Sequence, residues 1–246
     1  MTARARMLDY VLLAAVALLV WMLLFRWAGP EALAPPGETF RRIGQLITSL
    51  DFWDQVKATA LAFVYACVIA LAGGLLIGSV LGASRFARQV GEPMLTTLYS
   101  IPKITLYPVI LLLFGLGVSA KVAFGALHGI FPVALFTIGA FKNINPALIK
   151  TARVLRMSTA ESIRTLYFPA ALPEIVTGLR IGFSTTLLGT LIGELFASDR
   201  GVGFILIRAM EAHQVRDIMA LTFMLFATAA GFNAVLLAIE HTFHRR

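Results

Sequence analysis

Side chains that could act on a solute lie within long apolar stretches of this sequence. Lys103 directly follows Pro102 in one stretch. Another stretch carries a group of hydroxyls followed by a carboxylate: Ser184, Thr185, Thr186, Thr190 and Glu194. Polar groups in apolar surroundings are costly, so we treat them as functional candidates lining a polar path. Two alternatives stay open: a Thr hydroxyl can bond back to the preceding helical turn, and Lys103 can extend toward the cytoplasmic surface instead of attracting an anion.

Catalytic chemistry is not expected from these residues. The sequence has no nucleophile–base pair that we can name and no dense set of metal ligands. It also lacks the G-x-x-x-x-G-K-[ST] phosphate loop, so the chain is not an ATPase. We therefore predict no catalytic residue, no metal site and no cofactor in this chain.

Composition identifies the class of protein. Of 246 residues, 59% are hydrophobic and 14% are charged, and the mean hydropathy is +0.83. A soluble domain has roughly 45–50% apolar and about 25% charged residues. A soluble protein, a disordered chain and a disulfide scaffold are excluded, and an integral membrane protein remains. The net charge is +8. In a membrane protein, an excess of Lys and Arg is typical of the loops on the cytoplasmic side. We therefore expect the partner of this chain to be the lipid membrane and not nucleic acid.

Apolar runs of about 20 residues are long enough to cross the hydrocarbon core. We predict about six such helices in an all-α membrane protein, at residues 8–25, 56–83, 94–115, 121–141, 175–197 and 218–240. Pro102 and Pro108 interrupt the third run. The first run could be a secretory signal, but its length and the proline after Ala34 favour a retained helix. Lys and Arg in the loops place both termini in the cytoplasm.

Two segments outside the spans are expected on the outer side. Residues 26–55 form a periplasmic segment with an amphipathic helix from about Thr39. After the fifth span, Gly201 and Gly203 predict a sharp turn. The apolar stretch that follows, to Met210, is too short to span. It is either a helix that dips into the outer leaflet or a surface helix.

Glycines recur every four residues in several spans, which is typical of close helix packing. Packing within one subunit is the default interpretation, and a seam between two copies is the alternative for the fifth span. The predicted packing glycines are Gly74, Gly78, Gly82, Gly178, Gly182, Gly189 and Gly193, with Gly125 and Gly129 on the fourth span.

The loop at residues 142–174 contains several residues that typically start or end helices. Asn145 and Pro146 predict a helix start, and Ser158 with Glu161 matches a capping box for a second helix. Pro169 disfavours helix at Phe168 and should end that helix. We therefore expect a two-helix hairpin that bends near residues 156–158. Its apolar stripes favour docking into a groove on a soluble partner over a merely solvated hairpin.

The motifs of this loop resemble the EAA loop of permease subunits in binding-protein-dependent ATP-binding-cassette importers. The resemblance rests on the run at 150–156, the Phe168-Pro169-Ala170-Ala171-Leu172-Pro173 run and Gly178-Leu179-Arg180. The resemblance narrows to the nitrate/sulfonate/taurine class, because that class has similar residues at the positions of 101–103, 114–117, 193–195 and 201–203. The residues that the resemblance assigns to ATPase coupling are Lys150, Ala152, Arg153, Leu155, Arg156, Met157, Ser158 and Glu161.

This resemblance implies a type I importer permease fold, with a single permease domain over residues 1–246 and a permease core at 56–246. It also implies a second copy of the permease, a pair of ABC ATPase subunits that bind ATP and Mg, and a periplasmic or lipid-anchored solute-binding protein. The bacterial inner membrane is the expected location, and a small anion such as a sulfonate or nitrate is the expected solute. A stand-alone secondary transporter or channel is the alternative function.

The loop departs from the family pattern at several positions. Lys150 replaces the usual Glu, Thr151 replaces the first Ala and Phe168 replaces Leu. Arg156 replaces the usual Gly at the bend, although a bend Gly supplies backbone freedom that Arg lacks. This replacement suggests a bend that does not need a positive φ angle.

Overall fold

The computed structural model of this protein describes residues 3–244, and the predicted domain boundaries at residues 1 and 246 lie outside this range. The outermost helices are α1 (Ala3–Ala28) and α11 (Val215–His244). Between them lie helices of very different lengths: α2 (Pro36–Ile47), α3 (Leu50–Ala83), α4 (Arg85–Ser100), η1 (Lys103–Leu106), α5 (Tyr107–Phe114), α6 (Val118–Lys142), α7 (Pro146–Val154), α8 (Thr159–Ser162), the π-helical turn η2 (Ile163–Tyr167), α9 (Phe168–Ala197) and α10 (Val202–Glu211). The all-helical prediction is confirmed.

Helices long and apolar enough to cross a membrane are found where the sequence predicts them. Within the described residues there are 5 of these, or up to 6 when the bent pair of α4 with η1 and α5 is taken as one span. The third span is therefore not the single helix expected at 94–115. It starts at Arg85 and bends by 83° between Ser100 and Lys103. Pro102 explains this break, because proline has no N–H to donate and disfavours helix at the residue before it.

Three helices, α3, α6 and α9, form the centre of the bundle. The glycines of α3 and α9 face α6 at distances that leave no room for a side chain. A Cβ at Gly78 would lie 2.7 Å from the carbonyl oxygen of Ala134, and one at Gly193 would lie 2.9 Å from the Cα of Lys121. The other predicted packing glycines, Gly74, Gly82, Gly178, Gly182 and Gly189, also abut α6. Within this chain these glycines lie against α6, as the packing interpretation expects.

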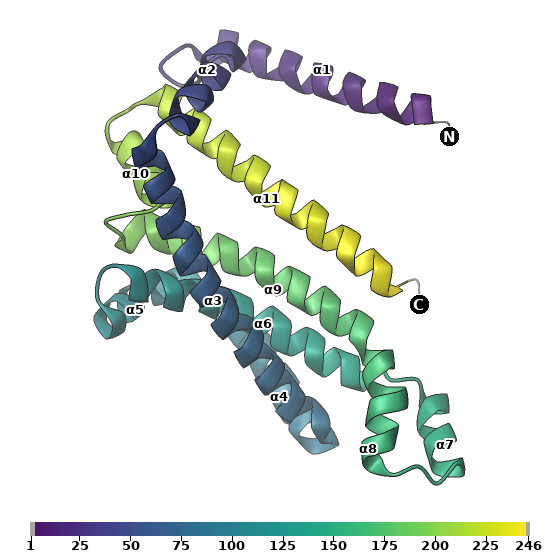
Figure 1. Cartoon of the computed structure of the whole chain (residues 1–246). Helices are drawn as coiled ribbons and strands as arrows, with labels where there is room; N and C mark the ends of the chain where they lie inside the picture. The colour runs from purple at the N-terminus through teal and green to yellow at the C-terminus, as the bar shows by residue number, and fades with distance from the viewer. Residues whose placement is uncertain (1–2, 245–246) are drawn as a thin grey trace.

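Helix α1 lies apart from this bundle, as Figure 1 shows. No residue in its apolar window is buried. Its Trp21 is the anchor: the indole N–H donates to the carbonyl of Ala34 over 3.0 Å, and the ring lies 6.1 Å from Phe223 of α11 and 6.3 Å from Phe40 of α2. The predicted amphipathic helix near Thr39 is α2, which joins α1 to α11.

Candidate functional site

The hairpin formed by α7, α8 and η2 projects from one end of the bundle (Figure 1). Local signals build it as predicted. The Asn145 side chain accepts the N–H of Ala147 over 2.9 Å and caps α7. The Ser158 hydroxyl accepts the N–H of Glu161 over 3.3 Å and caps α8. Each cap satisfies an N–H group that has no partner within its own helix.

The bend between α7 and α8 contains a positive φ angle, although the arginine at position 156 had suggested that none was needed. Arg156 has φ +51°, in the left-handed region. The N–H of Met157 donates to the carbonyl of Ala152 over 3.0 Å, and that of Arg156 donates to Arg153 over 3.1 Å. This is the Schellman pattern that ends many helices, usually with glycine at the left-handed position. The bend therefore needs a positive φ, and Arg156 adopts it at a cost of roughly 1–2 kcal/mol relative to glycine.

The second helix of the hairpin does not end at Phe168 as predicted. Instead η2 continues directly into α9, which begins at Phe168 and contains Pro169 in its first turn and Pro173 inside the helix. A π-helical turn bonds each N–H to the carbonyl five residues back, so the widened turn accommodates the missing N–H of Pro169. The second arm of the hairpin, α8 with η2, is therefore continuous with the 30-residue helix α9.

The surface of the hairpin is apolar at its tip and basic around it. Val154 is 81% exposed and Leu155 is 65% exposed, side by side at the end of this projecting segment. Lys150, Arg153, Arg156 and Arg164 are also exposed. Ala152, in contrast, is buried at 4% and faces the inside of the hairpin. The exposed apolar residues therefore form the surface available to a partner.

The base of the hairpin is tied to the bundle by polar contacts. Lys142 Nζ lies 2.9 Å from a carboxylate oxygen of Glu92 on α4. The Asn143 amide donates to Glu174 of α9 over 3.1 Å. These contacts hold the base of the hairpin against α4 and α9.

The hydroxyl residues of the predicted path fall into two groups by burial. Ser184 and Thr185 are half-buried, whereas Thr186 and Thr190 are fully buried. All of these hydroxyls donate to carbonyls of the preceding turn, as the alternative interpretation expected. Thr186 and Thr190 fill the space above Gly129 and Gly125 of α6, so in this conformation they contribute to packing.

Lys103 lies at the break of the bent span. Its ammonium donates to the carbonyl of Tyr99 over 3.0 Å and lies 4.3 Å from the centroid of the Tyr99 ring and 5.4 Å from that of Phe131. The half-buried side chain thus lies against two aromatic faces, where cation–π attraction favours an ammonium group.

Glu194 is fully buried and paired with Lys121, the first residue of the predicted fourth span. Lys121 Nζ lies 3.1 Å from a carboxylate oxygen of Glu194, and the two side chains are 1% and 0% exposed. A signal for this pair was present: Lys121 begins one apolar run and Glu194 ends another, and antiparallel spans bring those ends to the same depth.

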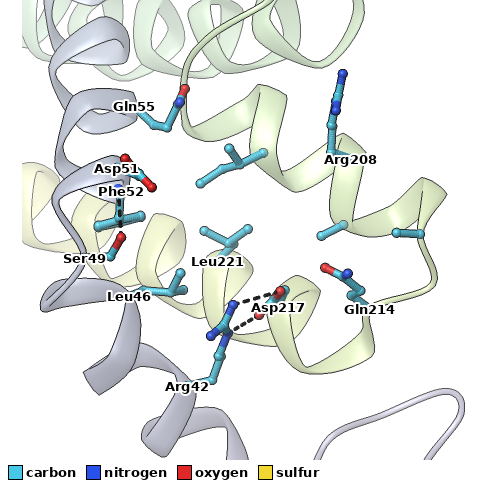
Figure 2. A pocket seen from close by; sticks show the side chains of 13 residues that line it. Arg42, Leu46, Ser49, Asp51, Phe52, Gln55, Arg208, Gln214, Asp217 and Leu221 are labelled. Atoms are coloured by element: carbon cyan, nitrogen blue, oxygen red, sulfur yellow. Dashed lines mark hydrogen bonds and ion pairs between the residues drawn. The ribbon is translucent and has the colours of Figure 1, made fainter.

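A cavity of about 450 Å³ opens at the same end of the bundle, among α2, α3, α10 and α11. Figure 2 shows Arg42 and Asp217 facing each other at its edge, with Leu46, Phe52 and Leu221 lining the apolar part. The Arg42–Asp217 ion pair raises the pKa of the Arg42 guanidinium, and Arg216 pairs with Glu38 over 2.7 Å. These pairs, which the sequence did not predict, hold α2 against the start of α11.

Comparisons with known proteins agree with this arrangement. Residues 70–246 match the family described as "Binding-protein-dependent transport system inner membrane component". The chain is 28% identical to a probable ABC transporter permease protein of Haemophilus influenzae, with 88% of each chain covered. It is 26% identical to the putative aliphatic sulfonates transport permease protein SsuC of Bacillus subtilis, over 85% of this chain and 77% of that one. It is 28% identical to the taurine transport system permease protein TauC of Escherichia coli, over 80% and 74%.

A solved structure shares the fold. The chain superposes on a chain of an amino acid ABC transporter crystallised with histidines, with a TM-score of 0.63 and 20% identity. The match covers 83% of this chain and 97% of that chain.

Proposed function

Because this chain belongs to the family of binding-protein-dependent transport system inner membrane components, we propose that it pairs with a second copy of itself around a path for a small anionic solute. The chain is a membrane permease subunit of an ATP-binding-cassette importer, and ATP hydrolysis belongs to a separate partner chain. A solute-binding protein is the other partner that this family implies. The permease is a multi-pass protein of the inner membrane.

The observation that carries the coupling proposal is the projecting hairpin with its exposed apolar tip. Val154 and Leu155 would enter a groove on the ATPase, and the surrounding cations would meet acidic groups at its rim. A pair of ATPase subunits would bind the hairpins of the two permease copies, and ATP with Mg would be held there. In this proposal the hairpin and both termini lie in the cytoplasm, and α2 and α10 lie on the opposite side, toward the solute-binding protein.

The solute proposal rests on charge and on the relatives. SsuC and TauC are described as permeases for aliphatic sulfonates and taurine, and Lys103 is a cation at the break of a span. Ser184 and Thr185 are the predicted path residues that retain exposed surface next to the buried Thr186 and Thr190. We assign the polar path to Lys103, Ser184 and Thr185.

The first prediction tests the function itself. We expect this chain to co-purify with a soluble ABC ATPase and, in proteoliposomes with the ATPase and the binding protein, to take up solute only when ATP is supplied. Hydrolysis by the ATPase should rise several-fold on assembly. Uptake without any ATPase would contradict the proposal and favour a stand-alone carrier.

The second prediction concerns Lys103. Replacing it with methionine should lower taurine uptake about tenfold, which corresponds to about 1.4 kcal/mol of lost attraction for the anion. Initial uptake rates in proteoliposomes measure this effect. Lys57→Met is the matched control, because that lysine is exposed on α3 and pairs only locally with Asp54 over 3.1 Å. Wild-type uptake by Lys103→Met would remove the side chain from the path.

A further inference from the structure

The buried ion pair at the outer end of the bundle is completely satisfied by short contacts. Lys121 Nζ donates to Glu194 over 3.1 Å, to the Ser198 hydroxyl over 3.3 Å and to the carbonyl of Arg200 over 2.9 Å. These contacts use all three N–H donors of the ammonium group. On the other side, Glu194 accepts the Thr59 hydroxyl over 2.8 Å and the N–H of Gly203 over 3.0 Å.

These contacts converge on the short connection between α9 and α10. Besides Lys121 and Glu194, α3 holds this connection directly. The Thr59 hydroxyl accepts the N–H of Val202 over 2.8 Å, and the Gln55 side chain accepts the N–H of Gly201 over 2.7 Å. Residues 198–203 are thus fixed to α3, α6 and α9 at once.

The connection fits tightly around the carboxylate. Gly201 has φ +123°, and a Cβ there would overlap the Glu194 carboxylate. A Cβ at Gly203 would lie 2.7 Å from the Cβ of Glu194 and 2.8 Å from the carbonyl oxygen of Leu191. Both glycines are therefore needed for the backbone to approach the ion pair, which accounts for the Gly-Val-Gly sequence.

Stability alone is a poor reason for such a pair. Replacing a buried ion pair with well-packed apolar side chains is often neutral or stabilising, because burial removes both charges from water. What the pair adds is a fixed geometry, since each hydrogen bond has a direction. Here that geometry locks α10, a ten-residue helix about 15 Å long that cannot cross the membrane.

The ion pair is also at the far end of the element that begins in the hairpin. Glu194 lies in the last turn of α9, and α9 continues from η2 without a break. At 1.5 Å per residue, α9 alone extends about 45 Å. A displacement of the hairpin therefore reaches the ion pair through one helix.

We propose that Lys121, Glu194 and Thr59 form a latch that makes α10 move as one body with α3, α6 and α9, so that motion at the cytoplasmic hairpin opens or closes the outer end of the path. This inference rests on the proposed function. The three residues are positioning residues: they act through α10 and do not touch the solute. Gln55, which accepts the N–H of Gly201, also lines the outer cavity together with Ile205 and Ala209 of α10.

The test measures how much ATP is hydrolysed for each solute taken up, in proteoliposomes that contain the permease, its ATPase and the binding protein. Thr59→Val removes one of the two side-chain hydrogen bonds from α3 to the start of α10, leaves that of Gln55 in place and keeps both charges paired. The double variant Lys121→Met/Glu194→Gln removes the ion pair without leaving an unpaired charge. We expect the ratio of ATP to solute to rise about tenfold in the double variant, a typical size for coupling between sites, and by less in Thr59→Val.

Thr137→Val is the matched control. Thr137 is also buried, on α6, but its hydroxyl donates to the carbonyl of Val133 in its own helix, over 2.7 Å. Its ratio should equal that of the wild type. The latch is refuted if Thr59→Val and the double variant also keep the wild-type ratio of ATP to solute. This includes the case in which uptake and hydrolysis fall together. A wild-type assembly that hydrolyses ATP without uptake would instead contradict the proposed function.

Discussion

Replacing Gly129 with valine is expected to prevent the α3–α6–α9 core from assembling. A Cβ at this position would lie 2.8 Å from the Cβ of Ala70 and 2.9 Å from the carbonyl oxygen of Gly182, and it would overlap the Thr186 hydroxyl. Thr186 cannot turn away freely, because its hydroxyl donates to that same carbonyl over 2.7 Å. Neighbours on both α3 and α9 would have to move, so we expect a loss of about 3 kcal/mol or more, at the upper end of the overpacking range.

Thermal unfolding of the detergent-purified chain measures this loss. Gly231→Val is the matched control, because a Cβ at Gly231 of α11 meets no atom within 4 Å. The control should unfold at nearly the wild-type temperature, whereas Gly129→Val should unfold far earlier or fail to accumulate in the membrane. Equal unfolding temperatures for the two variants would show that the core tolerates a side chain at Gly129.

Replacing Leu155 with aspartate should abolish assembly with the ATPase and leave the permease folded. Leu155 is 65% exposed at the tip of the hairpin, so little packing within the chain is lost. In the complex, the substitution would place a charge in an apolar groove. Truncating an interface anchor costs about 2 kcal/mol or more, which corresponds to at least about a 30-fold loss of affinity.

Co-purification and ATPase stimulation measure this effect, and the unfolding temperature of the isolated permease provides the check on folding. Thr159→Asp is the matched control: it adds the same charge to the same hairpin at an exposed position in the first turn of α8, where an acidic side chain is favourable. Normal assembly by Leu155→Asp would rule out the hairpin tip as the docking surface.

Ala152 is a weaker probe of docking, although the family motif assigns it to coupling. Its side chain is buried inside the hairpin, and its carbonyl accepts the N–H of Met157 over 3.0 Å. Aspartate at this position would disrupt the hairpin itself. Loss of uptake in Ala152→Asp would therefore not distinguish a docking defect from a local folding defect. The Leu155→Asp variant distinguishes the two.

Much of the fold follows from local signals in the sequence. The spans were predictable because an apolar run of about 20 residues has one stable solution in a membrane, a helix that satisfies its own backbone. The caps of the hairpin, Asn145 and Ser158, were predictable because a cap bonds to an N–H only two or three residues away. The break at Pro102 was visible for the same reason, although its 83° bend was not.

Features that depend on distant residues were not predictable in this way. The left-handed Arg156 runs against local preference, and the hydrogen bonds of the helix end, together with packing on η2, hold it there. The continuation of η2 into α9 through Pro169 likewise contradicted the local rule. At Arg156 the hydrogen bonds of the helix end, and at Pro169 the wider π-helical turn before it, outweigh a local preference of about 1–3 kcal/mol.

By itself, then, the sequence determined the membrane class, the spans, the hairpin and the family resemblance, because composition, periodicity and capping act over a few residues. Only the tertiary structure decided what the intramembrane polar groups do. Thr186 and Thr190 became packing residues because glycines on another helix lie opposite them. Glu194 became part of a latch because α6 brings Lys121 to it from 73 residues away. A side chain facing a polar path and one facing a buried partner look the same in sequence, since the difference lies in which helix is beside it.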